Sequence, residues 1–327
     1  MDEGDKARVL LVGSGGIGTI AALNLEAGGR ASVSAVLRSS YNVVAESGFT
    51  IESIDHGTIQ GFRPTHVLQA VPDVASHDVP PFDYIVCATK NLPGISNPSL
   101  TELLRPAVTP GHTAIILIQN GLDIELPFMA AFPQTPMLSG VSMCGSAEEK
   151  PGNIHHNCPD DLAVGVFENP RLSPDERASA TALAHDFVAR YGAGGKTSCY
   201  LDADVKATRW RKLVYNATMN PVCAITGLDS GAVRLQPGLI DSIVRPAMHE
   251  VVAAAAAYDV VLTEDVVDFM IECDPIESRF EPSMLVDARK NRYIECENLL
   301  GAPIRAAKFV WSDSRKSPKG EPTNGEE

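Results

Sequence analysis

Three glycines near the N-terminus, Gly13, Gly15 and Gly18, stand at G-x-G-x-x-G spacing. Apolar residues Val9–Val12 precede them and the helix-favouring run Thr19–Leu25 follows, so the order is strand, turn, helix. In such a unit the first glycine makes the tight turn, the second lets a pyrophosphate approach the backbone, and the third brings the helix close to the strand. The N–H groups of the first helical turn then face the anion. The pattern favours a dinucleotide site over a plain glycine-rich turn.

A second expected strand, Ala31–Leu37, ends in Arg38-Ser39-Ser40. At this position in a dinucleotide-binding fold an acidic residue selects NAD, whereas an arginine accepts the 2′-phosphate of NADP. The guanidinium fork of Arg38 suits a phosphate dianion, and no Asp or Glu stands beside it to repel one. The sequence therefore predicts NADP(H); the alternative is a solvated arginine at a strand end.

Two further buried strands end in polar side chains. Lys90 follows the strand expected at Asp83–Ala88, and Asn120 follows the one expected at Ala114–Gln119. Since parallel strands end on one edge of an open sheet, where such proteins bind ligands, we expect both residues near Gly13. Each alone fits a turn or capping role equally well, but their convergence favours ligand binding.

The order of these elements predicts an α/β protein with two domains. Strands and helices alternate up to residue 202, and long helical patterns without a convincing strand follow. We expect a Rossmann-type, doubly wound parallel sheet over residues 6–202 and an all-helical domain over residues 203–311. Residues 312–327 are too polar to pack and are expected to form a disordered tail. Smaller expected elements are short strands within Gly48–Gln69, strands at Ser139–Gly145, Leu162–Phe167 and Thr197–Leu201, and helices at Ser173–Tyr191 and Arg245–Tyr258.

Composition narrows the class of protein. The 327 residues carry a formal charge of −14, which opposes non-specific binding to nucleic acid or to an anionic membrane. The seven cysteines are odd in number and scattered without a C-x-x-C, which indicates reduced thiols and a cytoplasmic protein. The N-terminus is not of the signal-peptide type, and no apolar run approaches the ~20 residues of a membrane span. His155-His156 is interpreted as a pair of loop histidines, so no metal site is expected.

The expected second domain begins with a helix over Ala203–Met219 that Asn220-Pro221 ends. Lys212 and Asn216 lie on the side away from its apolar stripe, and Asn220 follows one turn later. Asparagine is a mediocre helix former, so two in this row fit hydrogen-bonding groups that line a cleft. Periodicity alone leaves a solvated face equally open.

A last long helix is expected over Glu281–Leu300. Ser283, Asp287, Asn291 and Glu295 recur along it at every fourth position. The row drifts by about 40° per step, so its ends need not face one another. A solvated face is its default interpretation.

These motifs together resemble the ketopantoate reductase (2-dehydropantoate 2-reductase) family. The matching stretches are V-G-S-G-G-I-G at 12–18, A-T-K at 88–90, Q-N-G at 119–121, W-R-K-L-V-Y-N-A-T-M-N-P at 210–221, S-M-L-V-D-A-R at 283–289 and E-x-E-N-L-L-G at 295–301. They span nearly the whole chain in the order that the family has.

The resemblance implies NADPH-dependent reduction of a 2-oxo acid to a 2-hydroxy acid, with ketopantoate, an intermediate of pantothenate biosynthesis, first among substrates. Lys212 matches the family's general acid, which protonates the carbonyl oxygen as hydride arrives; a lysine supplies both the proton and a positive charge. The residues expected to bind cofactor are Gly13, Ser14, Gly15, Gly16, Ile17, Gly18, Arg38, Lys90, Asn120 and Glu295. Those expected to bind substrate are Asn120, Asn216, Asn220 and Ser283. Because these residues come from both domains, the domains are expected to close over the cofactor.

Two positions depart from the family pattern. Ser230 and Phe280 stand where family members commonly carry asparagines that touch the substrate. The alternative substrate is therefore another branched 2-oxo acid or a ketone, because a polar site rejects ligands that leave its groups unpaired. The alternative from another class is a catalytically silent NADP-binding sensor. A homodimer is compatible with the sequence, which leaves the oligomeric state open.

Overall fold

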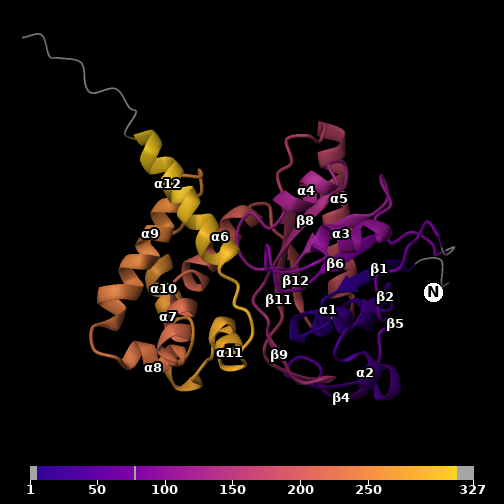
Figure 1. Ribbon diagram of the computed structural model, residues 1–327, viewed down its shortest axis with the longest axis horizontal. Helices are drawn as coiled ribbons and strands as arrows, with labels where there is room; N and C mark the ends of the chain where they lie inside the picture. The colour runs from indigo at the N-terminus through magenta and orange to yellow at the C-terminus, as the bar shows by residue number, and fades with distance from the viewer. Residues whose placement is uncertain (1–5, 77–78, 315–327) are drawn as a thin grey trace, which may run out of the picture. The chain divides into compact units, whose positions relative to one another are not determined.

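The computed structural model describes residues 6–76 and 79–314. The chain divides into two compact units, Met1–Arg209 and Trp210–Glu327, and the division falls within helix α6 (Val205–Asn216). The first unit holds a largely parallel sheet, and the described part of the second holds helices and turns without a strand, which confirms the predicted fold class (Figure 1). Of the expected tail, residues 312–314 belong to helix α12 (Ala302–Ser314), and residues 315–327 lie outside the described part.

Eight strands of the first unit form one sheet in the order β12-β11-β8-β7-β6-β1-β2-β5. They are β1 (Ala7–Val12), β2 (Ala31–Val36), β5 (His66–Leu68), β6 (Tyr84–Cys87), β7 (Ala114–Leu117), β8 (Met137–Ser142), β11 (Asp161–Val166) and β12 (Ser198–Leu201). All neighbours pair in parallel except β8 and β11. Val12 pairs with Cys87, and Cys87 pairs with Leu117, so the residues that follow β1, β6 and β7 share one edge.

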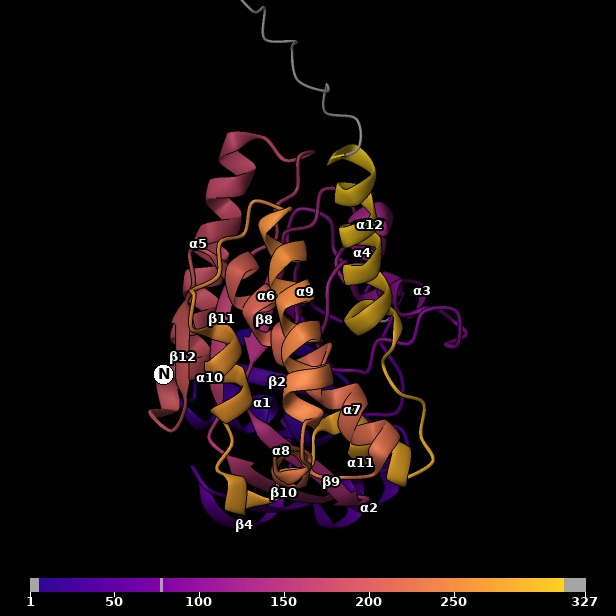
Figure 2. The ribbon, with the colours of Figure 1, turned by 90° about the vertical axis from the view of Figure 1, so that its left-hand side faces the viewer.

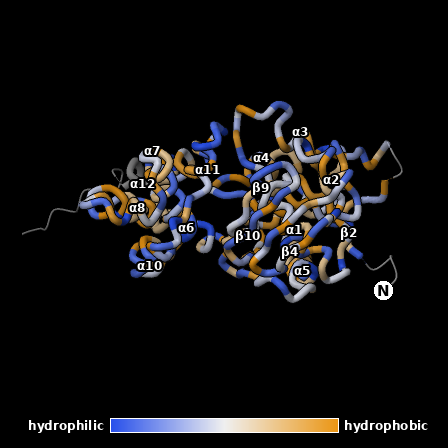
Figure 3. The backbone as a smooth tube through the Cα atoms, turned by 90° about the horizontal axis from the view of Figure 1, so that it is seen from below, coloured by the Kyte–Doolittle hydropathy of each residue, from blue (hydrophilic) through white to orange (hydrophobic). Residues whose placement is uncertain are grey.

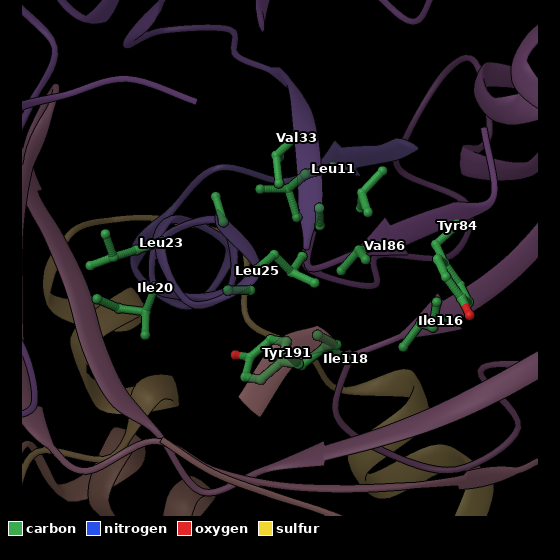
Figure 4. Packing of buried hydrophobic residues seen from close by; sticks show 14 of the residues in the cluster. Leu11, Ile20, Leu23, Leu25, Val33, Tyr84, Val86, Ile116, Ile118 and Tyr191 are labelled. Carbon is green, nitrogen blue, oxygen red and sulfur yellow. The ribbon is translucent and has the colours of Figure 1, made fainter. Parts of the chain in front are cut away.

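Alternate residues of the buried strands serve two cores. Val9 and Leu11 belong to the core that contains α1 (Gly16–Ala27) and α5 (Pro174–Tyr191), whereas Leu10 and Val12 belong to the one that contains α3 (Leu100–Leu104) and α4 (Leu126–Ala131). This alternation is expected of strands covered on both faces. Figure 4 shows the first core, where side chains of α1 lie beside the sheet and near Tyr191 of α5. The remaining helical elements of this unit are α2 (Tyr41–Ser47) and the 3₁₀ turns Arg105–Ala107 and Gly192–Gly194.

A second sheet, in the order β4-β3-β10-β9, contains two strands that the sequence did not predict. Its members are β3 (Phe49–Ser53), β4 (Gly57–Phe62), β9 (Gly145–Lys150) and β10 (Asn153–Cys158). The interpretation of His155-His156 as loop histidines is wrong, because both lie within β10. The strand escaped notice because its residues alternate between exposed and buried with little apolar content.

A buried polar network joins this second sheet to α1. His156 is 1% exposed, and its Nδ1 lies 2.8 Å from Ser53 Oγ. The His56 ring bonds Asn24 of α1, whose Nδ2 donates to the Asp160 carboxylate at 2.7 Å. Burial raises the pKa of Asp160, against the hydrogen bonds that it accepts. Among the described residues no group of three or more His, Cys, Asp or Glu side chains could hold a metal ion.

Two helix predictions for the second unit are wrong. The helix expected over Ala203–Met219 ends at Asn216, and Asn220 and Pro221 lie within the next helix. Pro221 is tolerated there because the first turn of a helix does not need its N–H. The helices of the unit beyond α6 are α7 (Met219–Thr226), α8 (Ser230–Leu235), α9 (Arg245–Ala256), α10 (Val266–Glu272), α11 (Ser283–Arg289) and α12, with a 3₁₀ turn at Ile276–Ser278 and π-helical turns at Ile240–Val244 and Glu297–Gly301.

The helix expected over Glu281–Leu300 does not exist as one element. Helix α11 ends at Arg289, and Asn291 adopts a φ of 50°, which no right-handed helix accommodates. Glu295 therefore lies in the segment between α11 and the π-helical turn, and the predicted four-residue row is absent.

The helices of the second unit bury one side each. In α10, Val266 and Met270 are buried whereas Phe269 is 47% exposed, and both hydrophobic and hydrophilic segments of the unit are visible in Figure 3. Helix α12 packs along α9, and α11 packs against α7 (Figure 2). No described helix combines the length and apolar content that crossing a bilayer demands.

Candidate functional site

The glycine turn after β1 lies against the end of β6. Gly13 has a φ of 105°, and a Cβ there would stand 2.5 Å from the backbone nitrogen of Thr89. A Cβ on Gly18 would stand 1.9 Å from the carbonyl oxygen of Gly13. Both positions require glycine because backbone occupies the space of a side chain. The turn and the Thr89-Lys90 segment are thereby held in direct contact.

Gly15 differs, because no described atom lies within 4 Å of the position that its Cβ would take. It precedes α1, whose first turn receives no hydrogen bond from a capping side chain in the described chain. The first N–H groups of this helix, which starts at Gly16, are therefore able to face an anion. Gly16 itself is packed, since its Cβ would stand 2.3 Å from the carbonyl oxygen of Ser146 in β9. Ile17 is half-buried within this first turn.

Alanine at Gly15 and alanine at Gly18 are expected to fail in different ways. Gly15 has a φ of −80° and open space, so Gly15→Ala should fold like the parent but lose contacts between pyrophosphate and backbone N–H groups. Hydrogen bonds to charged groups contribute about 1.5–3 kcal/mol, so their loss should weaken NADPH binding about 10–100-fold. Gly18→Ala should instead lower the free energy of unfolding by about 1–3 kcal/mol or more through overpacking.

Thermal unfolding and NADPH titration calorimetry of both variants check this pair. Parent-like NADPH affinity in Gly15→Ala would show that no pyrophosphate approaches the backbone at this residue.

Ser14 links the glycine turn to the end of β2. Its hydroxyl donates to the carbonyl oxygen of Val36 at 3.3 Å, and Thr19 Oγ1 donates to the carbonyl oxygen of Ser14 at the same distance. Arg38 follows two residues after Val36 and its side chain is exposed. The structure thus places Arg38 just beyond the strand that the glycine turn contacts, at the position where a 2′-phosphate is selected in this fold.

The ends of β6 and β7 are joined by Gln119. Its Nε2 donates to the carbonyl oxygen of Thr89 at 2.9 Å and lies 3.1 Å from Thr89 Oγ1. Lys90, which is exposed, and Asn120, which is half-buried, each directly follow one of these two linked residues. The convergence of Lys90 and Asn120 on one edge is therefore what the structure shows, and Gln119 is the side chain that secures it.

Arg209 is a further polar residue at this edge that sequence reasoning missed. The side chain is buried and its Nη1 donates to the carbonyl oxygens of Gln119 and Gly121 at 2.8 and 3.0 Å. Burial lowers the pKa of Arg209 to about 10, against the influence of the nearby Glu125 carboxylate, whose own pKa is raised by burial. No periodicity distinguishes this arginine from its neighbours in the sequence, because its partners lie about ninety residues away.

In the second unit, Asn216 and Asn220 meet across the break between α6 and α7. Asn220 Nδ2 donates to Asn216 Oδ1 at 3.3 Å. Asn220 is 2% exposed, and its own Oδ1 finds no hydrogen-bond partner within the described residues. A buried, unpaired amide oxygen is costly unless a ligand donates to it. Lys212 is half-buried on α6, one turn before Asn216.

The remaining candidates are distributed over the second unit. Ser283 is exposed and begins α11, the helix that packs against α7. Ser230 and Phe280, the two departures from the family pattern, lie together, since the Ser230 backbone N–H donates to the Phe280 carbonyl oxygen at 2.9 Å. Ser230 Oγ is buried and has no hydrogen-bond partner in the described chain. Glu295 does not lie on a helix with Ser283.

Comparisons with known proteins cover nearly the whole chain. Models described as "Ketopantoate reductase PanE/ApbA" and "Ketopantoate reductase PanE/ApbA C terminal" match residues 9–169 and 204–310. An uncharacterized protein of Saccharomyces cerevisiae is 36% identical over 321 residues, which cover 92% of this chain and 88% of that protein.

Two solved structures extend the likeness. The 2-dehydropantoate 2-reductase of Methylococcus capsulatus is 29% identical with a TM-score of 0.73, covering 95% of this chain and 98% of that one. D-mandelate dehydrogenase in a ternary structure with NADH and anilino(oxo)acetate shares the fold, at 20% identity and a TM-score of 0.76 over 93% of both chains. With both family models matched in order and a relative at this identity over most of its length, the chain belongs to the ketopantoate reductase family.

Proposed function

We propose that this protein is an NADPH-dependent reductase that converts a 2-oxo acid to a 2-hydroxy acid. The family consists of NAD(P)-dependent oxidoreductases, and this chain has the family's glycine turn, Lys212 and both helical asparagines. The observation that carries the proposal is the buried Asn220 amide, which is bonded to Asn216 and holds an unpaired oxygen. An unsatisfied buried polar group that bonds Asn216, eight residues after Lys212, is explained by a ligand that donates to it.

The glycine turn fits a dinucleotide, because Gly15 leaves open space before an uncapped helix. In the proposed assignment, the first turn of α1 holds the pyrophosphate, Arg38 holds the 2′-phosphate, and Lys90 and Asn120 serve the nicotinamide end. When bound, NADPH supplies the hydride for the carbonyl carbon. Glu295 remains a proposed cofactor contact on the strength of the family match alone.

The protein's own side chains are proposed to contribute a proton donor, a positive charge and hydrogen bonds to the substrate. Lys212 Nζ would donate a proton to the carbonyl oxygen as negative charge develops on it, and its positive charge would stabilise that oxygen beforehand. Asn220 Oδ1 would accept a hydrogen bond from a donor on the substrate, with Asn216 fixing the orientation of the amide. Ser283 is proposed to bind the substrate from the start of α11.

Ketopantoate is the first candidate substrate, as it is in the relatives named 2-dehydropantoate 2-reductase. Ser230 and Phe280 weaken the match to its hydroxyl and carboxylate groups, because they replace two amides by one buried hydroxyl and an aromatic ring. A less polar 2-oxo acid is the second candidate, since it would leave fewer groups of its own unpaired.

NADPH consumption with a panel of 2-oxo acids tests the proposal. The panel contains ketopantoate, 2-oxoisovalerate, pyruvate and phenylglyoxylate, and chiral chromatography identifies the 2-hydroxy acid formed. We expect the parent protein to reduce at least one member of the panel. The Lys212→Ala variant should reduce the same acid far more slowly. Tight NADPH binding without turnover of any member would instead support the silent sensor.

A further inference from the structure

The Arg209 side chain hydrogen-bonds the backbone on both sides of Asn120. Its Nη1 donates to the carbonyl oxygens of Gln119 and Gly121, the residues directly before and after Asn120. Gly121 has a φ of 95°, which a residue with a side chain rarely adopts. The conformation of the Asn120 segment is therefore defined by a tight turn and by a guanidinium that bridges it.

The same guanidinium also bonds the middle of the neighbouring strand, β8. Nε and Nη2 donate to Ser139 Oγ at 3.2 and 2.7 Å, and Nη2 donates to the carbonyl oxygen of Gly140 at 3.3 Å. With the two bonds of Nη1, the five N–H groups of Arg209 make five hydrogen bonds, in a planar fork that lysine cannot reproduce. The Phe167 ring lies beneath the guanidinium, with its centroid 5.3 Å away.

Burial of a guanidinium has an unfavourable desolvation free energy. Taking an ionised group out of water is unfavourable unless hydrogen bonds replace those that it made to water. An apolar residue at this position would leave the carbonyl oxygens of Gln119, Gly121 and Gly140 without this donor, so the arginine is matched to the backbone on either side of Asn120. The nearby Glu125 carboxylate, which is also buried, opposes the lowering of the Arg209 pKa by burial.

Arg209 is also part of helix α6, which carries Lys212. Lys212 follows three positions after Arg209, a rise of about 4.5 Å along the helix. The start of α6 is fixed as well, because Asp202 Oδ1 accepts from the Asp204 backbone N–H and a Cβ on Gly165 of β11 would stand 2.6 Å from Val205 Cβ. The first turns of α6 are thus anchored to the sheet edge that carries Asn120.

We propose that Arg209 is a positioning residue for the reduction, which holds the Asn120 backbone and the first turns of α6, up to Arg209 itself, on one edge of the sheet. The inference rests on the proposed function, in which Asn120 and Lys212 take part in turnover. It adds a residue that acts through the backbone of Asn120 and determines how precisely that side chain is held. Misplacement of about 1 Å is enough to cost about 100-fold in rate.

Arg209→Met is the main test, since it keeps the apolar stem and removes all five N–H groups. We expect kcat for the best 2-oxo acid of the panel to fall about 10–100-fold, with a smaller change in NADPH affinity because the glycine turn is untouched. Amide hydrogen exchange should quicken in residues 118–122 and 205–216 while the strands of the sheet stay protected. Arg209→Lys should recover only part of kcat.

A double-mutant cycle separates positioning from general damage. In an Asn120→Ala background, Arg209→Met should reduce kcat much less than in the parent, since the amide that Arg209 positions is already gone. Loss of thermal stability alone would be the same in both backgrounds. Lys206→Met, at an exposed lysine of the same helix, is the matched control and should leave kcat and exchange unchanged.

If Arg209→Met fails to fold, Ser139→Ala removes the acceptor of two of the five hydrogen bonds. It should lower kcat and quicken amide exchange in the same segments, but by less. Parent-like kcat, or parent-like exchange in residues 118–122 and 205–216, would overturn the inference. Hydrogen exchange decides the anchoring even where no 2-oxo acid is turned over, so its outcome stays distinct from failure of the proposed function.

Discussion

Replacing Lys212 with alanine is expected to lower kcat for the preferred 2-oxo acid by about 10²–10⁴-fold, the range lost with a positioned general acid. The developing alkoxide would lose both its proton source and the positive charge that stabilises it. The dissociation constant of NADPH should change by less than about threefold, because the pyrophosphate and 2′-phosphate contacts assigned to the first unit remain. Stopped-flow measurement of a single turnover, with calorimetric NADPH titration, separates the two quantities.

A matched lysine on the same helix provides the control. Lys206 is exposed, whereas Lys212 is half-buried one turn before the Asn216–Asn220 pair. Lys206→Ala should therefore leave kcat unchanged and alter the free energy of unfolding by less than about 0.5 kcal/mol. If well-folded Lys212→Ala retained a rate within about threefold of the parent, rather than losing two decades or more, the proton would have to come from Lys90 or Glu295.

The elements best predicted from sequence are those whose signals are local. Buried parallel strands appear as short apolar runs, and Gly13 and Gly18 follow the first run at a spacing that close backbone contact requires. Helix α5 likewise begins with a complete capping box, in which Ser173 and Glu176 bond each other's backbone N–H groups. Such signals depend only on residues that are close together in the sequence.

The errors fall where tertiary structure overrides the local pattern. The residues of α6 and α7 read as one helix, although the backbone breaks between Asn216 and Met219 and brings two asparagines together. Helix α11 ends in a polar stretch where Asn291 adopts a left-handed conformation. Asparagine tolerates this conformation, but its presence in a sequence does not predict it. Hydrophobic periodicity cannot register either break.

The residues that organise the candidate site were hidden for a related reason. Gln119 and Arg209 act through backbone carbonyls on neighbouring strands, and such acceptors are present at every position of a sequence. Only the strand order reveals which ones meet. The one available signal was a polar residue directly after a buried strand, and it pointed to Lys90 and Asn120 rather than to Gln119 or Arg209.

Exchange of Arg38 for aspartate should reverse the cofactor preference of the protein. The parent is expected to bind NADPH more tightly than NADH, since Arg38 is exposed just beyond β2 and no carboxylate neighbours it in sequence. Arg38→Asp removes charge-assisted hydrogen bonds worth about 1.5–3 kcal/mol and adds repulsion, so NADPH affinity should fall about 100-fold. NADH affinity should hold or rise, because aspartate can accept from the ribose hydroxyls.

Arg38→Gln separates the two contributions to this shift. Glutamine removes the positive charge without adding a negative one, so it should weaken NADPH less than aspartate does and leave NADH unchanged. The salt dependence of NADPH binding supplies an independent readout, since an exposed ion pair with the 2′-phosphate weakens as ionic strength rises. Equal affinity of the parent for NADPH and NADH in calorimetric titration would refute the assignment, and the selectivity of the site would then have to lie outside Arg38.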